Sequence, residues 1–335
     1  LKPENKESLF GQLKLNNKIY LENKGIIHNN FQDIRNFNKL EECIKNFQPE
    51  IVFHLAAQPL VRKSYLEPLD TWQINVQGSL NLLEALKSLN SFCSVVMVTT
   101  DKVHLNKNWD FGYRENDKLG GHDPYSASKA AAEIAIDSWR SSFCGSSNHQ
   151  TPNLGISTAR AGNVIGGGDW AKDRIIPDCI KSWISEKKVI IKNPKSTRPW
   201  QHVLEPLGGY INLALSLSKD TKLHGESFNF GPPMTQDKTV LDIVSELSTY
   251  FEKSKWKIQN KAKKNIIESN LLKLNCEKAF HKLNWNSSLD FSDIIFFTSD
   301  WYQSYLRKKN LIKVTNDQIE SFYAKAISKG NKWIK

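Results

Sequence analysis

The chain has 335 residues, of which 39% are hydrophobic and 24% are charged. This length allows a large buried core and suits either one large α/β domain or a larger domain that carries a smaller lobe, of which we favour the second. The formal net charge is +11, but the excess lysines lie in polar stretches without interleaved aromatic residues, so we expect no nucleic-acid partner. No apolar run approaches the ~18 residues that a membrane-spanning helix needs, and we expect no membrane partner.

The cysteines are scattered along the chain without a Cys-x-x-Cys pair. Their spacing predicts neither a zinc site nor a disulfide framework, so we expect no bound metal. It is typical of a protein in a reducing compartment and predicts a cytoplasmic location. The five positions are Cys43, Cys93, Cys144, Cys179 and Cys276.

In the first half of the chain, apolar runs typical of strands alternate with longer stretches typical of helices. The expected strands lie at 25–29, 51–57, 94–100 and 155–160, and the expected helices lie at 38–46, 71–88 and 124–142. This alternation predicts an α/β fold of the Rossmann type, a doubly wound parallel sheet with right-handed crossovers.

The pattern loosens after Asp169, where short strand-like and helical pieces mix, and a helix with an aromatic face is expected at 293–308. We therefore predict a Rossmann domain at 1–168. Residues 169–335 should form mainly a smaller C-terminal substrate lobe, with some elements that return to the Rossmann domain.

A tyrosine and a lysine stand four residues apart, as Tyr125 and Lys129, at the start of the expected helix 124–142. This spacing places the phenol and the ammonium on one helical face, where the lysine can lower the pKa of the tyrosine. A phenol with a lowered pKa can act as a general base toward a sugar hydroxyl. The same spacing also occurs on helices where both side chains only face solvent, so the surrounding sequence has to decide.

Polar residues follow the expected buried strand 94–100 at its carboxyl end, where open α/β sheets bind their ligands. Thr100 can hydrogen-bond a substrate hydroxyl, Asp101 can deliver a proton, and Lys102 can act as a base if it is partly desolvated. The alternative is that Asp101 and Lys102 merely cap the next element.

Together with His54-Leu-Ala-Ala-Gln58 and Asn75, these motifs resemble the extended short-chain dehydrogenase/reductase family. Within it, longer strings resemble nucleotide-sugar 4,6-dehydratases, over about 9–305. These strings are HLAAQPLVRKSY, GYRENDKLGGHDPYSASK, ARAGNVIGGGDWAKDRIIPD and RPWQHVLEPLGGY. The resemblance implies CDP-glucose as the substrate, because the related dehydratases of dTDP-glucose have a glutamate in place of Lys102 and the epimerases lack the acidic-basic pair.

The resemblance further implies NAD as the cofactor and an internal redox cycle. Tyr125 would take the proton of the C4 hydroxyl, Lys102 would remove the C5 proton, and Asp101 would protonate the departing C6 hydroxyl. Lys129 would hold the cofactor ribose.

The same resemblance implies further binding residues, position by position. Those on the cofactor side, besides Tyr125 and Lys129, are Asp33, Ile34, Leu55, Ala56, Ala57, Gln58, Asn75 and Thr99. Those on the substrate side are Asn163, Arg174, Arg198 and His202. The two arginines suit a diphosphate, although each could instead form a surface ion pair.

The chain also departs from the family pattern. Histidine stands at positions 104 and 122 and alanine at 127, where the family has other residues, and no glycine-rich G-x-x-G-x-x-G loop is present. We therefore expect the first strand, the glycine loop and the second strand to be missing, with an open groove where they would lie. A dehydratase or epimerase of another nucleotide sugar, or an inactive binding module, remains an alternative. We expect a homo-oligomer formed through the helices at 71–88 and 124–142.

Overall fold

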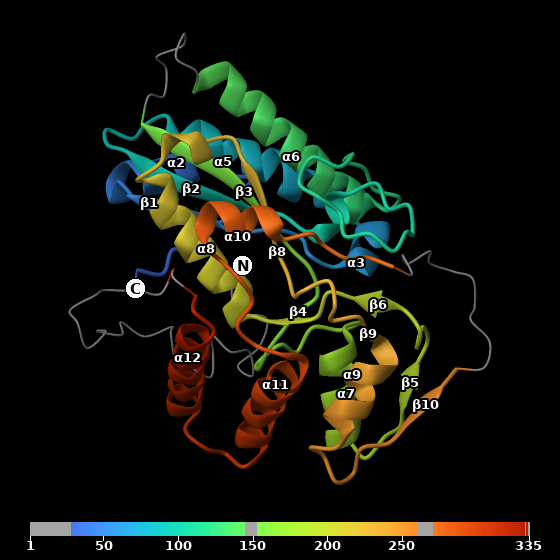
Figure 1. The fold of residues 1–335 in the computed structure, drawn as a ribbon. Helices are drawn as coiled ribbons and strands as arrows, with labels where there is room; N and C mark the ends of the chain where they lie inside the picture. Colours follow the sequence, from blue (N-terminus) through green and yellow to red (C-terminus); the bar gives the residue numbers. More distant parts are fainter. Residues whose placement is uncertain (1–27, 145–152, 260–270, 332, 334–335) are drawn as a thin grey trace.

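The computed structural model describes residues 28–144, 153–259, 271–331 and 333. Within these residues, a four-stranded parallel sheet has the order β1-β2-β3-β8 (Figure 1). Its strands are β1 (Ile51–His54), β2 (Cys93–Val98), β3 (Leu154–Ala161) and β8 (Ser227–Phe230). The predicted parallel α/β fold is therefore confirmed.

Helices cover both faces of this sheet, as Figure 1 shows. On one face lie α2 (Phe37–Phe47), α5 (Gly78–Leu86) and α6 (Pro124–Phe143). On the other lie α8 (Leu204–Leu217) and α10 (Glu277–Leu283), which come from the second half of the chain. The sheet therefore joins segments that are far apart in sequence.

Burial on both faces explains the sequences of the central strands. Successive side chains of a strand point to opposite faces, so Val95 and Met97 pack in the core under α5 and α6 while Val96 packs under α8. Every residue of β3 is buried. Strands covered on both sides read as continuous rather than alternating apolar runs, as the sequence of β2 does.

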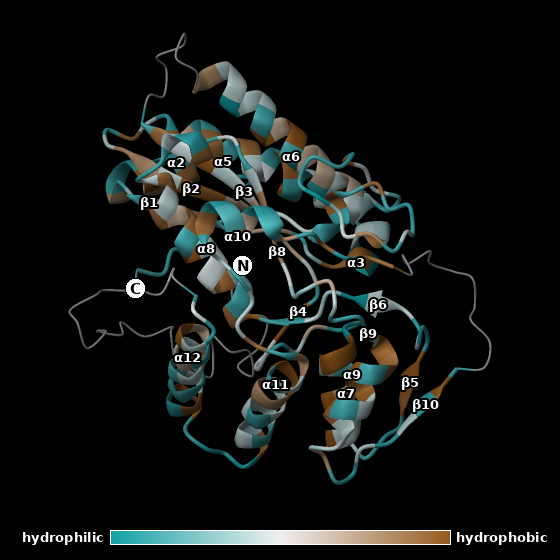
Figure 2. Cartoon of the chain, in the orientation of Figure 1, coloured by the Kyte–Doolittle hydropathy of each residue, from teal (hydrophilic) through white to brown (hydrophobic). Residues whose placement is uncertain are grey.

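A second core lies below the sheet in Figure 1 and forms a smaller lobe. Its helices are α7 (Ile175–Ile184), α9 (Val240–Ser248), α11 (Phe291–Leu306) and α12 (Leu311–Ser328). Its short strands pair as β5 (Val189–Ile191) with β10 (Trp256–Ile258), and β6 (Thr197–Arg198) with β9 (Lys238–Thr239). Figure 2 shows hydrophobic residues concentrated on α9, β5 and β10, around the core that contains Trp183 and Trp301.

The connection between the two regions consists of β4 (Val164–Ile165) paired in parallel with β7 (Gln201–His202). The remaining short elements are α3 (Val61–Leu66), α4 (Pro68–Trp72), a π-helical turn η1 (Gln73–Gln77), and the 3-10 turns η2 (Asp101–Val103) and η3 (Thr221–Leu223). None of the helices in the described ranges has the length and apolar composition needed to cross a membrane.

Two predicted elements differ from the structure. The helix expected at 71–88 is divided into α4, the π turn η1 and α5. The strand expected at 51–57 ends at His54, and four residues further on the backbone N–H of Gln58 bonds the side chain of Asn75. Of the strand expected at 25–29, residues 25–27 lie outside the described residues, and Asn29 belongs to no strand.

A buried ion pair fastens α6 to β3. The guanidinium of Arg160 contacts both carboxylate oxygens of Glu133, and both residues are almost fully buried. Arg160 Nη1 also donates to the carbonyl of Glu115, and Thr99 Oγ1 donates to Glu133. The charges are therefore paired and hydrogen-bonded, as burial requires.

We expect Glu133→Gln to lower the free energy of unfolding by about 3–5 kcal/mol, because it leaves the buried charge of Arg160 without its counterion. Chemical denaturation followed by circular dichroism measures this change. Glu186→Gln is the matched control, because it removes the carboxylate of an exposed pair with Lys253 and should leave stability unchanged. Equal effects of the two substitutions would contradict the prediction.

Candidate functional site

The candidate site lies at the carboxyl ends of the parallel strands. The segment Thr99–Lys102 directly follows β2, and α6 begins beside it at Pro124 with Asp123 as its N-cap. The Asp123 carboxylate accepts the backbone N–H of Ser126 at 2.9 Å, and proline at the first helical position needs no such partner. The start of α6, and with it Tyr125, is thereby fixed. Ser64 Oγ accepts the backbone N–H of Tyr125 at 3.2 Å.

Tyr125 and Lys129 are both buried, so they are not a solvent-facing pair. Lys129 Nζ lies 3.3 Å from the carbonyl oxygen of Val98, the last residue of β2. Burial lowers the pKa of Lys129 to about 8, and the negative charge of Glu133 opposes that shift. The structure thus places the ammonium at the end of β2, on the same helical face as the phenol.

The expectation that Lys129 lowers the pKa of Tyr125 is wrong in this structure. Burial raises the pKa of Tyr125 to about 12, and a hydrogen bond with Thr100 opposes the shift. The nearby carboxylate of Asp101 acts in the same direction as burial, and the charge of Arg174 acts against it. Desolvation of the phenolate is therefore the dominant effect, which spacing along a helix does not reveal.

Asp101 is buried beside Tyr125. Its Oδ1 accepts a hydrogen bond of 2.9 Å from Thr100 Oγ1, and its Oδ2 has no partner among the described residues. Burial raises the pKa of this carboxyl, and the charge of Lys102 partly opposes that shift. The 3-10 turn that follows is capped by Thr100, so the alternative role of Asp101 as a cap is not observed. Lys102 is half-buried.

The basic residues predicted on the substrate side have different environments. Arg198 is buried and donates to the carbonyl of Thr197 at 2.7 Å, and its charge also lowers the pKa of Asp101. Arg174 is partly exposed and forms an ion pair of 3.0 Å with Asp169, the surface pairing considered as its alternative. His202 is buried, and its Nε2 has no partner among the described residues.

Asn163 follows β3 with φ of 44°, a left-handed conformation that asparagine tolerates better than most residues. Its carbonyl accepts the backbone N–H of Gln201. The glycines at 166–168 form the loop after β4. At Gly167 an added Cβ would lie 2.0 Å from the ring of Trp301, so close packing explains this glycine.

On the predicted cofactor side, Asn75 holds the segment after β1 against α6. Its side chain accepts the N–H of Gln58 at 2.9 Å and donates to Ser128 Oγ at 2.9 Å. The Gln58 amide is itself bonded to Leu60 and Thr71, so it stiffens the loop. Asn75 lies in the π turn η1, and such turns are frequent at functional sites.

The other predicted cofactor residues lie on both sides of this loop. Leu55 and Ala56 are exposed at the end of β1, and Ala57 is half-buried. Asp33 is exposed, and its hydrogen bonds with Arg35 lower its pKa to about 2. Ile34 packs against Gly78 at the start of α5.

Several residues of the site were missed by sequence reasoning. Ser64, Glu133 and Arg160 position Tyr125, Thr99 and α6, and only Glu133 carries a sequence signal, four residues after Lys129 on the same face. Buried His104 stacks on Tyr113 with 5.1 Å between ring centroids. No group of three or more potential metal ligands occurs in the described part of the chain.

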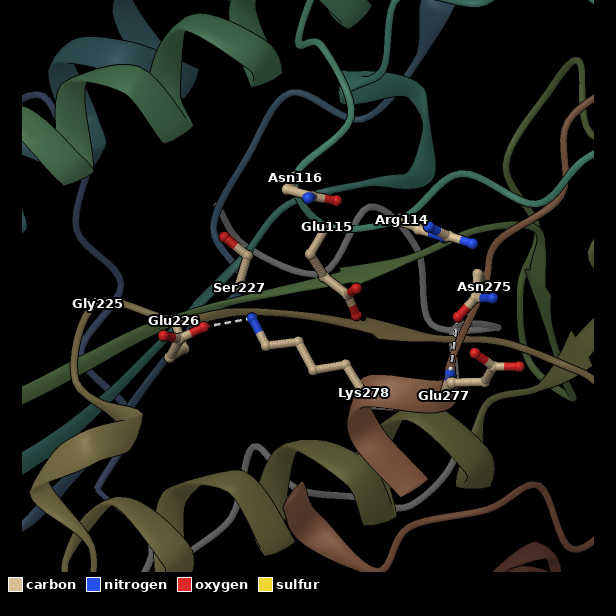
Figure 3. Close-up of a pocket in the computed structure, with 9 residues that line it drawn as sticks. All are labelled: Arg114, Glu115, Asn116, Gly225, Glu226, Ser227, Asn275, Glu277 and Lys278. Atoms are coloured by element: carbon tan, nitrogen blue, oxygen red, sulfur yellow. Dashed lines mark hydrogen bonds and ion pairs between the residues drawn. The ribbon is translucent and has the colours of Figure 1, made fainter. Parts of the chain in front are cut away.

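A cavity of about 670 Å³ lies away from these residues, between the loop at 114–116, the start of β8 and the start of α10 (Figure 3). Lys278 extends along it toward Glu226, with which it forms an ion pair. None of the predicted site residues lines this cavity. It is therefore separate from the candidate site.

Comparison with known proteins gives close relatives. The chain matches the family described as GDP-mannose 4,6 dehydratase over residues 5–296. It is 40% identical over 316 residues to a CDP-glucose 4,6-dehydratase of Salmonella typhimurium, covering 94% of this chain and 85% of that protein. It is 25% identical over 294 residues to a dTDP-glucose 4,6-dehydratase of Haemophilus influenzae, covering 81% of each.

Solved structures share the fold. A UDP-glucose 4-epimerase with UDP-glucose from Thermotoga maritima has a TM-score of 0.68 at 20% identity, covering 85% of this chain and 87% of that one. DesIV, a dTDP-glucose 4,6-dehydratase from Streptomyces venezuelae with NAD and TYD bound, has a TM-score of 0.63 at 20% identity, covering 83% and 80%. The fold is thus the Rossmann type shared by these epimerases and dehydratases. Within that class, the chain belongs to the GDP-mannose 4,6 dehydratase family, which confirms the resemblance seen in its sequence.

The pKa of Lys129 generates a prediction on stability. Its value falls from 10.5 to about 8 on folding, so at pH 7 the unfolded state binds its proton more tightly and the buried charge destabilises the fold. Lys129→Met should therefore raise the free energy of unfolding at pH 7, by at most about 3 kcal/mol.

This gain should shrink as the pH rises from 7 to 9.5, because the wild-type lysine loses its proton in the folded state first. Urea denaturation of both proteins at the two pH values, without nucleotide, measures the difference. A gain that stays constant with pH would show that Lys129 is not a buried charge.

Proposed function

We propose that this protein catalyses the NAD-dependent 4,6-dehydration of CDP-glucose to CDP-4-keto-6-deoxyglucose. The observation that carries the proposal is the burial of Tyr125, Lys129 and Asp101 at the end of β2, with the half-buried Lys102 next to them. Family membership and the similarity to a CDP-glucose 4,6-dehydratase support the reaction class and the nucleotide. The cysteines and the absence of a spanning helix among the described helices are compatible with action in the cytoplasm.

The residues around Lys129 fit a bound NAD. An ammonium has three donors, and that of Lys129 has one hydrogen-bond acceptor among the described residues, the carbonyl of Val98. A ribose hydroxyl is a suitable partner for the others. Leu55 and Ala56 are exposed at the end of β1, where open α/β sheets hold a nucleotide. When bound, NAD would accept a hydride from C4 of the sugar and return it to C6.

Tyr125 is the base for the C4 hydroxyl in this proposal. Burial disfavours its phenolate, and the nearby charge of Arg174 favours it. Thr100 hydrogen-bonds the phenol, and in this proposal it also orients the sugar hydroxyl. The proton of the C4 hydroxyl moves to the Tyr125 oxygen as the hydride leaves C4.

Asp101 and Lys102 serve the elimination. A 4-keto group makes the C5 proton acidic, and Lys102 accepts that proton in its neutral form. Burial raises the pKa of Asp101, which favours its protonated form, and in this proposal that form gives its proton to the C6 oxygen as water departs. The C5–H and C6–O bonds break, and a C5–C6 double bond and water form.

We also propose that the protein forms a homo-oligomer through the side of the sheet covered by α4 and α6. Leu66 and Leu69, next to and in α4, are 81% and 77% exposed, and Ile134 on α6 is 60% exposed. Large apolar side chains gathered on adjoining elements are typical of protein contacts. This surface adjoins Tyr125 through Ser64 in α3.

The substrate assignment is tested by incubating the protein with NAD and, separately, the glucose derivatives of CDP, dTDP and UDP and the mannose derivative of GDP. We expect 4-keto product from CDP-glucose, and Tyr125→Phe should reduce its rate by at least about 100-fold with the fold intact. Product from another sugar only would support a different dehydratase. Binding without any product would support an inactive binding module.

Lys102→Ala should block elimination while leaving C4 oxidation possible, because Tyr125 and Lys129 are unchanged. Reduced nicotinamide should then accumulate in a single turnover with CDP-glucose, seen by its absorbance. Lys107→Ala serves as the matched control, because Lys107 lies five residues further along and its ammonium covers the ring of Trp109. Unchanged turnover of Lys102→Ala would refute the role of Lys102.

A further inference from the structure

The Asp101 carboxyl occupies space that is free because the residue directly after the neighbouring strand β3 is a glycine, Gly162. Its residue is 1% exposed, and its Oδ2 has no hydrogen-bond partner among the described residues. Gly162 directly follows β3 and faces this carboxyl. A Cβ added to Gly162 would lie 2.0 Å from Asp101 Oδ2 and 2.2 Å from its Cγ. Such distances are far inside van der Waals contact, so a side chain at 162 and this position of the carboxyl exclude each other.

The need at position 162 is for space and not for an unusual backbone conformation. Gly162 does not have a positive φ, unlike Gly225 and Gly330. An L-residue could therefore adopt its backbone geometry. The carboxyl of Asp101 is the feature that excludes a side chain.

The backbone of Gly162 is held in place. Gln201 is 1% exposed, and its Nε2 donates to the carbonyl of Gly162 at 3.2 Å and to that of Phe230 at 2.8 Å. Gln201 therefore ties the ends of β3 and β8 together. Asp101 begins the 3-10 turn capped by Thr100, so its backbone is fixed as well. The movable part is the Asp101 side chain, which an added methyl group would displace from its present position.

We propose that Gly162 is a positioning residue for the elimination step, because it admits the Asp101 carboxyl to the place from which it protonates the C6 oxygen. This inference rests on the proposed function. Gly162 touches no reacting atom in it and acts only through Asp101. The oxidation of C4 by way of Tyr125 and Lys129 does not depend on it.

The test is Gly162→Ala, compared with Gly231→Ala. Gly231 directly follows β8, the strand next to β3, and a Cβ there would find its nearest neighbour, Cys276 Sγ, at an ordinary 3.5 Å. With CDP-glucose, Gly162→Ala should slow dehydration on the order of 100-fold, the usual effect of displacing a catalytic group by about 1 Å. Reduced nicotinamide should accumulate in a single turnover, and Gly231→Ala should behave as the wild type.

A double variant separates positioning from general damage. If Gly162 acts through Asp101, then Gly162→Ala should cost nothing further in an Asp101→Ala background. An additional loss of tenfold or more in that background, or equal slowing of C4 oxidation and dehydration, would overturn the proposal. Full activity of Gly162→Ala would overturn it as well.

A crystal structure of Gly162→Ala gives a readout that needs no activity. The Asp101 carboxyl should be rotated away from Thr100 while the backbone of residues 160–163 stays in place. A carboxyl that keeps its bond to Thr100 would refute the positioning role. If the wild type fails on every nucleotide sugar, the proposed function fails, whereas this structural comparison still decides whether Gly162 positions Asp101.

Discussion

The ends of two buried parallel strands determine where this protein can carry out chemistry. Because β2 and β3 are covered by helices on both faces, their flanks have no polar surface, and polar groups can reach a ligand only where the strands stop. Parallel pairing puts those ends at the same edge of the sheet. Thr99–Lys102 after β2 and Gly162 after β3 are neighbours for this reason, although 60 residues separate them.

Several ionisable side chains are buried at this edge of the sheet, and each must offset the free-energy cost of removing its charge from water. Arg160 and Glu133 neutralise each other through several hydrogen bonds, so they can stay charged. Asp101 has no comparable partner, and burial raises the pKa of its carboxyl. Lys129 has one carbonyl acceptor, and burial lowers the pKa of its ammonium. The same local environment thus disfavours the charged forms of both side chains.

The sequence predicted the elements whose pattern is set by burial, and it missed those set by contacts between distant segments. β2, β3 and α6 were found nearly to their ends, because apolar runs and the Asp123-Pro124 start are local signals. In the structure Thr100 and Asp101 lie next to Tyr125, and the ammonium of Lys129 lies at the end of β2. The sequence did not predict that the pKa of Tyr125 is raised, because the burial of this side chain depends on residues from several elements.

The role of Gly162 could not be predicted from the sequence either, because it depends on a contact between distant segments. Nothing adjacent in the chain distinguishes it from other glycines that follow strands, and its requirement comes from the side chain of residue 101 across the sheet. The role of Gln201 is equally nonlocal, since its two acceptors end two different strands. Residues that act by leaving room, or by tying strand ends, are recognised only when the partner segments are in place.

Because of the π turn between α4 and α5, the contacts of this segment depend on its number of residues as well as on its side chains. A π turn accommodates one residue more than the α-helical turn it replaces. Since each helical residue advances by about 100°, losing one residue from 73–77 would rotate either α5 or Asn75 by that angle. His54 would then lose its 3.1 Å contact with Ser79, or Ser128 its bond to Asn75. Exchanging exposed side chains along this segment would leave these contacts in place, whereas an insertion or deletion would break one of them.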